Sequence, residues 1–145
     1  MIYELAKPED IQAVYNVVQH TIKTIYPKYY PMEVVDFFCG HHSEDAIEKD
    51  IKNGYVSVLK IDGTIVATGC FVDDHITRVY VLPEHQKKGY GTFIMKNIEV
   101  QNRQIKTGKC HSVPTVQENG KIELSEQWQW TSGDYSKGES LLVEV

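Results

Sequence analysis

The sequence predicts a mixed α/β (α+β) fold, in which a mainly antiparallel sheet is flanked by helices, and two patterns support this prediction. Residues 55–61, 64–72 and 75–82 are three successive runs rich in β-branched residues, as is typical of strands. Apolar residues recur at helical spacing before these runs, in residues 8–25, and after them, in residues 90–101. We therefore expect helices on both faces of the sheet and a cleft at the end of the third strand.

The first strand and helix are expected at the N-terminus. Residues 2–5 form a short strand-like run, and Pro8 followed by two acidic residues is typical of a helix start. The apolar positions that then share one helix face are Ile11, Val14, Val17, Val18, Ile22 and Ile25. Tyr26-Pro27 is expected to end this helix, and its apolar stripe is interpreted as part of the core.

Two short helices are expected between the first helix and the meander. They cover residues 33–39 and 43–52, and the second begins at Ser43, a favourable N-cap, and ends at Asn53-Gly54. Downstream, Asp62-Gly63 and Asp73-Asp74 separate the three strand-like runs. Such short connections are typical of hairpins, so the three strands should pair as an antiparallel meander.

Composition indicates one domain, residues 1–145, with a single modest core. The chain has 145 residues, of which 41% are hydrophobic and 24% are charged, as is ordinary for a globular protein. The N-terminus lacks a basic and then apolar leader, and no apolar run approaches membrane length. We therefore expect a cytoplasmic protein that has no membrane partner.

Charge and cysteine content exclude several classes of site. The formal charge of −5 disfavours a nucleic-acid partner and is compatible with a cationic or amine ligand. Cys39, Cys70 and Cys110 are widely spaced, which argues against a disulfide framework. A zinc site built on Cys39, His41 and His42 has no second ligand pair at zinc spacing, so we expect no metal site.

A glycine-containing basic loop joins the third meander strand to the last predicted helix. Gly89 and Gly91 allow the backbone to approach a ligand closely, and the helix that follows directs its first N–H groups toward an anion. Lys87 and Lys88 add positive charge. The dinucleotide and P-loop fingerprints are both absent. A phosphate site and a purely structural turn both remain compatible with these residues.

The loop resembles the acetyl-CoA signature of the GNAT superfamily of N-acetyltransferases, [Gln/Arg]-x-x-Gly-x-[Gly/Ala]. Here the signature reads Gln86-Lys87-Lys88-Gly89-Tyr90-Gly91 and follows a strand that ends near Pro83. The predicted order of strand, helices, three strands and helix is also similar to that family. The resemblance covers roughly residues 1–101, whereas the polar residues 102–145 are atypical and look more like strands around turns.

The resemblance implies transfer of an acetyl group from acetyl-CoA to an amine by direct attack. It implies that the loop residues bind the pyrophosphate and that a backbone N–H near the end of the preceding strand stabilises the oxyanion. The implied cofactor-binding residues are Tyr80, Val81, Leu82, Gln86, Lys87, Lys88, Gly89, Tyr90, Gly91 and Thr92. Tyr80 itself is expected to pack in the core, so its side chain is secondary to its backbone.

The general base and the acid are expected among residues outside the loop. Candidates for the base are Asp73, Asp74, His75 and Glu33, although the two aspartates also suit a hairpin turn. Tyr135 is the family-analogous acid that would protonate the CoA thiolate. Its motif, Tyr135-Ser136-Lys137-Gly138, is one residue shorter than the family's and lacks the final aromatic residue.

Two functions remain open at this point. The first is an N-acetyltransferase that modifies the primary amine of a small molecule or a peptide, with the acceptor wall in residues 29–45. The alternative is a GNAT-like module that binds acyl-CoA without catalysis because its altered C-terminal part lost the acceptor site or the acid. The sequence identifies neither the acceptor nor the choice between a monomer and a homodimer.

Overall fold

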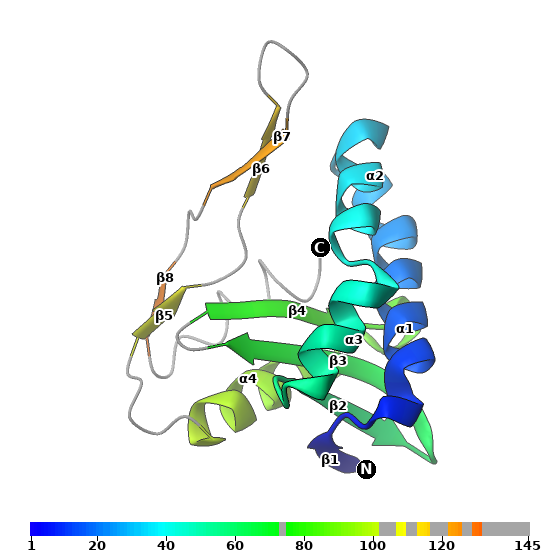
Figure 1. The fold of residues 1–145 in the computed structure, drawn as a ribbon, viewed down its shortest axis with the longest axis vertical. Helices are drawn as coiled ribbons and strands as arrows, with labels where there is room; N and C mark the ends of the chain where they lie inside the picture. Colours follow the sequence, from blue (N-terminus) through cyan, green and yellow to red (C-terminus); the bar gives the residue numbers. More distant parts are fainter. Residues whose placement is uncertain (73–74, 102–106, 110–112, 117–121, 126–128, 132–145) are drawn as a thin grey trace.

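An antiparallel four-stranded sheet forms the centre of the computed structural model (Figure 1). The structure describes residues 1–72, 75–101, 107–109, 113–116, 122–125 and 129–131. Its strands are β1 (Ile2–Leu5), β2 (Val56–Ile61), β3 (Thr64–Val72) and β4 (His75–Val81), and the last three form the predicted meander. Two short strands extend it to six in the order β1-β2-β3-β4-β5-β8. They are β5 (Thr107–Lys109), parallel to β4, and β8 (Gln129–Thr131), antiparallel to β5.

The β2–β3 connection is the tight hairpin that the sequence predicts. Asp62 and Gly63 both have positive φ, 52° and 80°, as a two-residue type I′ turn requires. The register runs from Ile61 opposite Thr64 to Val56 opposite Cys70. The other predicted turn, Asp73-Asp74, lies outside the described residues.

Helices cover both faces of the sheet, as the two apolar stripes predict (Figure 1). One face carries α1 (Ile11–Ile25), α2 (Met32–His41) and α3 (Glu44–Lys52). The other carries α4 (Tyr90–Gln101), which contacts β3 and β4. Short 3₁₀ turns precede α1, follow α1 and follow β4: η1 (Pro8–Asp10), η2 (Tyr26–Lys28) and η3 (Pro83–His85).

Local signals explain where these helices begin. Pro8 starts a 3₁₀ turn rather than the α-helix itself, and the Asp10 carboxylate accepts a hydrogen bond from the Lys7 N–H at 2.9 Å. Ser43 caps α3 by accepting from the Ala46 N–H at 3.2 Å, as its N-cap position predicts. The sequence-predicted boundaries therefore hold to within a few residues.

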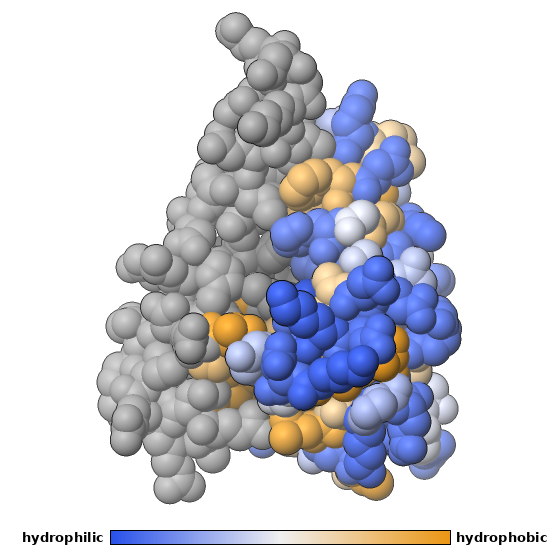
Figure 2. Space-filling view, in the orientation of Figure 1, coloured by the Kyte–Doolittle hydropathy of each residue, from blue (hydrophilic) through white to orange (hydrophobic). Residues whose placement is uncertain are grey.

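The sheet separates two cores. Between the sheet and α1–α3, the predicted stripe residues Val14, Val18 and Ile22 are almost completely buried. On the opposite face, Ile94 and Ile98 of α4 pack against the sheet. On the outside, Figure 2 shows hydrophilic side chains over α3. Among the residues of this helix, Lys52 forms an ion pair with Glu48, with Nζ 2.9 Å from Oε1.

The C-terminal part contains strands, as expected from its composition. A separate two-stranded sheet pairs β6 (Val113–Val116) with β7 (Ile122–Ser125) in antiparallel register. Both strands lie within residues 102–145, the stretch expected to form strands around turns. In the described part of the chain, no helix is both long and apolar enough to cross a membrane.

Gly69 of β3 allows α4 to approach the sheet closely. A Cβ at Gly69 would lie 2.6 Å from Ile94 Cγ2 and 3.3 Å from Ile98 Cδ1. We expect Gly69→Ala to lower the free energy of unfolding by about 1–3 kcal/mol, because overpacking forces these buried side chains or α4 to move. Urea unfolding followed by circular dichroism measures this change.

Gly40 of α2 supplies the matched control. A Cβ there would meet nothing within 4 Å. Because alanine favours a helix interior over glycine, Gly40→Ala should leave stability unchanged or raise it by up to about 1 kcal/mol. Equal effects of the two substitutions would contradict close packing at Gly69.

Candidate functional site

The candidate site lies where β4 leads through η3 into α4. The Gln86 side chain turns back toward the strand and donates from Nε2 to the Val81 carbonyl oxygen at 2.9 Å. Leu82 remains attached to the sheet, because its N–H donates to the Val66 carbonyl at 2.9 Å. The start of the glycine loop is therefore fixed to the end of β4, which gives Gln86 a structural role in this loop.

The loop backbone has the shape expected of an anion site. Lys87 and Gly89 have left-handed φ values of 63° and 85°, and the Phe93 N–H donates to the Gly89 carbonyl at 3.0 Å at the start of α4. An α-helix leaves its first N–H groups without carbonyl partners inside the helix, and they attract anions. The space around the Gly89 Cα is open, since an added Cβ would meet nothing within 4 Å. An anion can therefore approach this backbone.

The two loop lysines lie beside this backbone in solvent. Lys87 and Lys88 are both exposed, whereas Tyr90 is half-buried and Gly91 is buried in the first turn of α4. Exposed ammonium groups are screened by salt within about 10 Å at moderate ionic strength. We therefore expect the main chain to make the specific contacts with an anion, and the lysines to add a weaker and less directional attraction.

The strand register identifies which backbone N–H groups of β4 face away from β3. Leu82 bonds to Val66, and Tyr80 lies opposite Thr68 in the same register, so the N–H groups of Leu82 and Tyr80 point toward β3. The alternation of a strand then directs the Val81 N–H toward the opposite edge. Among the three predicted oxyanion donors, Tyr80 to Leu82, the register narrows the choice to Val81.

The edge of β4 near Val81 is open among the described residues. In the described residues, β5 pairs with β4 only at the first residue of β4, where His75 lies opposite Lys109, the last residue of β5. The strand then continues to Val81 without a second described partner on that side. Among the described residues, the β4 edge that leads toward the glycine loop therefore has no strand partner beyond His75.

A partly buried polar cluster lies on the α1–α3 side of β4. Arg78 donates from Nε to His42 Nδ1 at 3.1 Å and forms an ion pair with Asp50, with Nη1 to Oδ2 at 2.5 Å. Cys70 Sγ lies 3.8 Å from Arg78 Nη1. Sequence reasoning missed this cluster, because no spacing relates its members. An arginine inside a strand-like run was the one local signal.

Two tyrosine hydroxyls meet in the same core. The Tyr26 and Tyr80 hydroxyl oxygens lie 3.1 Å apart, and both rings are buried. Burial raises the pKa of both phenols far above the ordinary value, so neither ionises near neutral pH. Tyr80 therefore acts as a core residue through its side chain, as its sequence context suggests.

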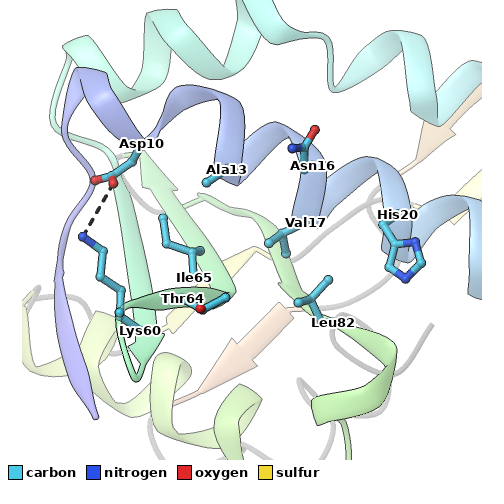
Figure 3. A pocket seen from close by; sticks show the side chains of 10 residues that line it. Asp10, Ala13, Asn16, Val17, His20, Lys60, Thr64, Ile65 and Leu82 are labelled. Carbon is cyan, nitrogen blue, oxygen red and sulfur yellow. Dashed lines mark ion pairs between the residues drawn. The ribbon is translucent and has the colours of Figure 1, made fainter.

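A surface groove of about 520 Å³ lies between α1 and the start of β3, and it ends at Leu82 (Figure 3). One end of the groove carries an ion pair between Lys60 Nζ and Asp10 Oδ1 at 3.5 Å (Figure 3). Near its other end, His20 Nε2 of α1 lies 3.9 Å from a carboxylate oxygen of Glu84 in η3. The groove thus borders the glycine loop on the α1 side of the sheet.

Only two of the predicted catalytic residues, His75 and Glu33, belong to the described part of the chain, and neither lies at the glycine loop. His75 begins β4, at the end of the strand opposite the loop, and Glu33 lies exposed in the first turn of α2. Asp73, Asp74 and Tyr135 lie outside the described residues.

The residues expected to form the acceptor wall are mostly solvent-facing. The exposed members are Tyr29, Glu33, Asp36, Glu44 and Asp45. Tyr30 is the half-buried exception, and its ring packs edge-on against Tyr26. Across the described residues, no group of three or more His, Cys, Asp or Glu side chains could hold a metal ion.

Comparison with known protein families gives one match, to the family described as avidin-like protein, over residues 62–145. This range includes β3, β4, the glycine loop and α4 together with the C-terminal strands. No curated protein matches the sequence.

A comparison with solved structures identifies the fold. The chain is similar to the PaiA N-acetyltransferase of Thermoplasma acidophilum in complex with coenzyme A (TM-score 0.64, 13% identity, 88% of this chain and 98% of that chain). It is also similar to a GCN5-related N-acetyltransferase of Rhodopseudomonas palustris (TM-score 0.76, 14% identity, 90% and 94%). A third similar structure is a GNAT family acetyltransferase of Brucella melitensis in complex with acetyl-CoA (TM-score 0.56, 15% identity, 76% and 73%). These likenesses confirm the predicted α/β architecture as the GNAT fold.

Proposed function

The chain belongs to the family of avidin-like proteins and has the GNAT fold, and from this fold and the geometry of its glycine loop we propose that it is an acyltransferase that uses acetyl-CoA. The finer proposal is an N-acetyltransferase that modifies a primary amine of a small molecule or peptide. One observation carries it: Gln86 fixes the glycine loop to the end of β4, with Nε2 2.9 Å from the Val81 carbonyl oxygen, and Gly89 of this loop has the left-handed φ of +85° that suits an anion site.

The loop and the strand edge suit different parts of one ligand. The backbone from Gln86 to Thr92 would hold the pyrophosphate, with charge added by Lys87 and Lys88. The extended pantetheine arm would follow the open edge of β4, whose peptide groups can pair with its amides. The thioester carbonyl would then accept a hydrogen bond from a β4 edge N–H. In the similar structures from Thermoplasma acidophilum and Brucella melitensis, the bound molecules are coenzyme A and acetyl-CoA.

The chemistry needs little more from the protein than positioning and one preorganised donor. Acetyl-CoA supplies an activated thioester, which a neutral amine attacks to form the amide and release the CoA thiolate. An edge N–H of β4 would stabilise the negative charge that develops on the carbonyl oxygen, a contribution of about 3 kcal/mol in other acyl-transfer enzymes. Because ammonium groups must lose a proton before attack, a base would act directly or through water. We retain Asp73 and His75 as the proposed bases.

The experiment that tests the function is thiol release from acetyl-CoA across a panel of amines, together with calorimetric titration of CoA and acetyl-CoA. Amine-dependent thiol release supports the enzyme. Firm binding without transfer to any amine favours the alternative, a module that binds acyl-CoA without catalysis. If neither CoA nor acetyl-CoA binds, both functions are wrong.

Tyr135 is the proposed acid, and Tyr135→Phe tests this role. We expect acetyl-CoA affinity to change less than about threefold and turnover to fall by about 10²-fold, because the substitution removes a proton donor and little binding surface. Steady-state kinetics and calorimetry measure the two effects separately. Equal turnover in a folded Tyr135→Phe protein would show that the thiolate obtains its proton elsewhere.

A further inference from the structure

Arg78 interrupts β4 with a backbone conformation that favours glycine. Its φ is +47°, which is uncommon for a side chain of this size. The pairing of β3 with β4 shifts register at this point, since Cys70 lies opposite Thr77 whereas Thr68 lies opposite Tyr80. The strand therefore carries a bulge at Arg78, immediately before the segment that borders the glycine loop.

The Arg78 side chain is held from three sides. Asp50 of α3 pairs with Nη1 at 2.5 Å, His42 at the end of α2 accepts from Nε at 3.1 Å, and Cys70 of β3 lies 3.8 Å from Nη1. The arginine side chain is only 10% exposed and that of Asp50 21%. Charge-assisted hydrogen bonds in such a protected setting fix side-chain geometry more firmly than surface pairs do.

This clamp acts on the backbone that follows it. Val79 and Val81 belong to the core beside α4, and Tyr80 belongs to the core beside α1, so the segment after the bulge alternates as a regular strand. The register turns the N–H of Tyr80 toward β3 and that of Val81 toward the opposite edge, and the same alternation, counted back from Tyr80, directs the Val79 N–H to that edge. The orientation of these two N–H groups thus depends on the conformation at Arg78.

We propose that Arg78 is a positioning residue, whose clamp to Asp50 and His42 holds the bulge that directs the Val79 and Val81 N–H groups toward the thioester carbonyl. This inference rests on the proposed function, because it assigns the β4 edge to the thioester. It goes further than that function, because it attributes the alignment of the edge to the Arg78–Asp50 ion pair on the α1–α3 side of the strand. Arg78 itself does not touch the acyl donor in this proposal.

The test compares Arg78→Gly, Arg78→Lys and Asp50→Asn with the parent. Arg78→Gly accepts the left-handed backbone but removes the side chain that contacts Asp50 and His42. Arg78→Lys keeps the charge but lacks the planar guanidinium group, and Asp50→Asn removes the ionic partner while leaving Arg78 in place. Asp62→Gly is the control, because Asp62 also has a positive φ, 52°, but lies in the β2–β3 turn. Circular dichroism and thermal melting first establish that each variant is folded.

The decisive measurement is the ratio of the dissociation constants for CoA and acetyl-CoA, which isolates the acetyl group and needs no turnover. A hydrogen bond to the thioester carbonyl should make the parent bind acetyl-CoA about fivefold more tightly than CoA. We expect Arg78→Gly and Asp50→Asn to reduce this ratio to about one while CoA affinity changes less than threefold. Arg78→Lys should retain part of the preference, and Asp62→Gly all of it.

Two further readouts separate positioning from general stability. With an accepted amine, turnover should fall at least tenfold in Arg78→Gly with little change in the KM for acetyl-CoA, and the amide NMR signals of Val79 and Val81 should shift. An unchanged ratio and unchanged turnover in folded Arg78→Gly and Asp50→Asn would overturn the proposal. A parent that binds neither CoA nor acetyl-CoA would instead refute the proposed function itself.

Discussion

Replacing Gly89 with alanine is expected to weaken acetyl-CoA binding at least tenfold. Gly89 has a φ of +85°, which L side chains adopt at an energetic cost, so the substitution should move the loop out of its present conformation. A hydrogen bond to a charged phosphate contributes about 1.5–3 kcal/mol, so the loss of one contact corresponds to roughly 10–100-fold in affinity. Isothermal titration calorimetry measures the change directly. Gly91→Val, in the first turn of α4, should act in the same direction.

Gly54→Ala is the matched control for this prediction. Gly54 also has a left-handed φ, +76°, and open space around its Cα, so the backbone cost should be similar. It lies after α3, near the start of β2, at the end of the sheet away from the glycine loop. Lys88→Ala should also have a small effect, about threefold or less, because its ammonium group is exposed. If Gly89→Ala and Gly91→Val both bind acetyl-CoA as tightly as Gly54→Ala, the cofactor loop lies elsewhere.

Val18→Asp is expected to unfold the protein. The Val18 side chain is completely buried, in the core between α1 and the sheet. An aspartate there would bury a charge without a partner, and such changes cost more than about 4 kcal/mol, a large part of the total stability of an ordinary domain. Far-ultraviolet circular dichroism at 25 °C should show a loss of helix content, and a thermal melt should show no cooperative transition.

Gln12→Asp, on the exposed side of the same helix, separates burial from helix propensity. Its side chain donates to Asn16 at 3.0 Å on the surface, so the substitution removes a weak contact and introduces aspartate where it is hydrated. We expect a change of less than about 1 kcal/mol in the free energy of unfolding. A cooperative melt for Val18→Asp at the parental temperature would contradict the placement of α1 on the sheet.

Local patterns determined most of the fold as far as α4. The stripe of Val14, Val18 and Ile22 repeats at the helical period and therefore identifies both the helix and its buried face. Asp62-Gly63 supplies the positive φ values of a type I′ turn, which fixes the β2–β3 hairpin. The signature around Gly89 likewise identified the loop, because its backbone geometry depends on neighbouring residues. These features are local, so the sequence alone could determine them.

Other features depend on contacts between distant parts of the chain. Arg78 and His42 are 36 residues apart, and only the packing of α2 and α3 on β4 brings them together. The choice of Val81 rather than Tyr80 or Leu82 as an edge donor depends on the pairing of β4 with β3, because a shift of one residue would reverse it.

The C-terminal strands show the same division between local and distant information. Composition indicated strands in residues 102–145, but the parallel pairing of β5 with β4 and the separate β6–β7 sheet depend on partners that no local pattern names. The sequence by itself determined the helices, the meander and the glycine loop, since each follows from periodicity or turn chemistry over a few residues. Tertiary structure alone decided which N–H groups of β4 face away from β3 and what holds Arg78, because both depend on strand register and on side chains that folding brings together.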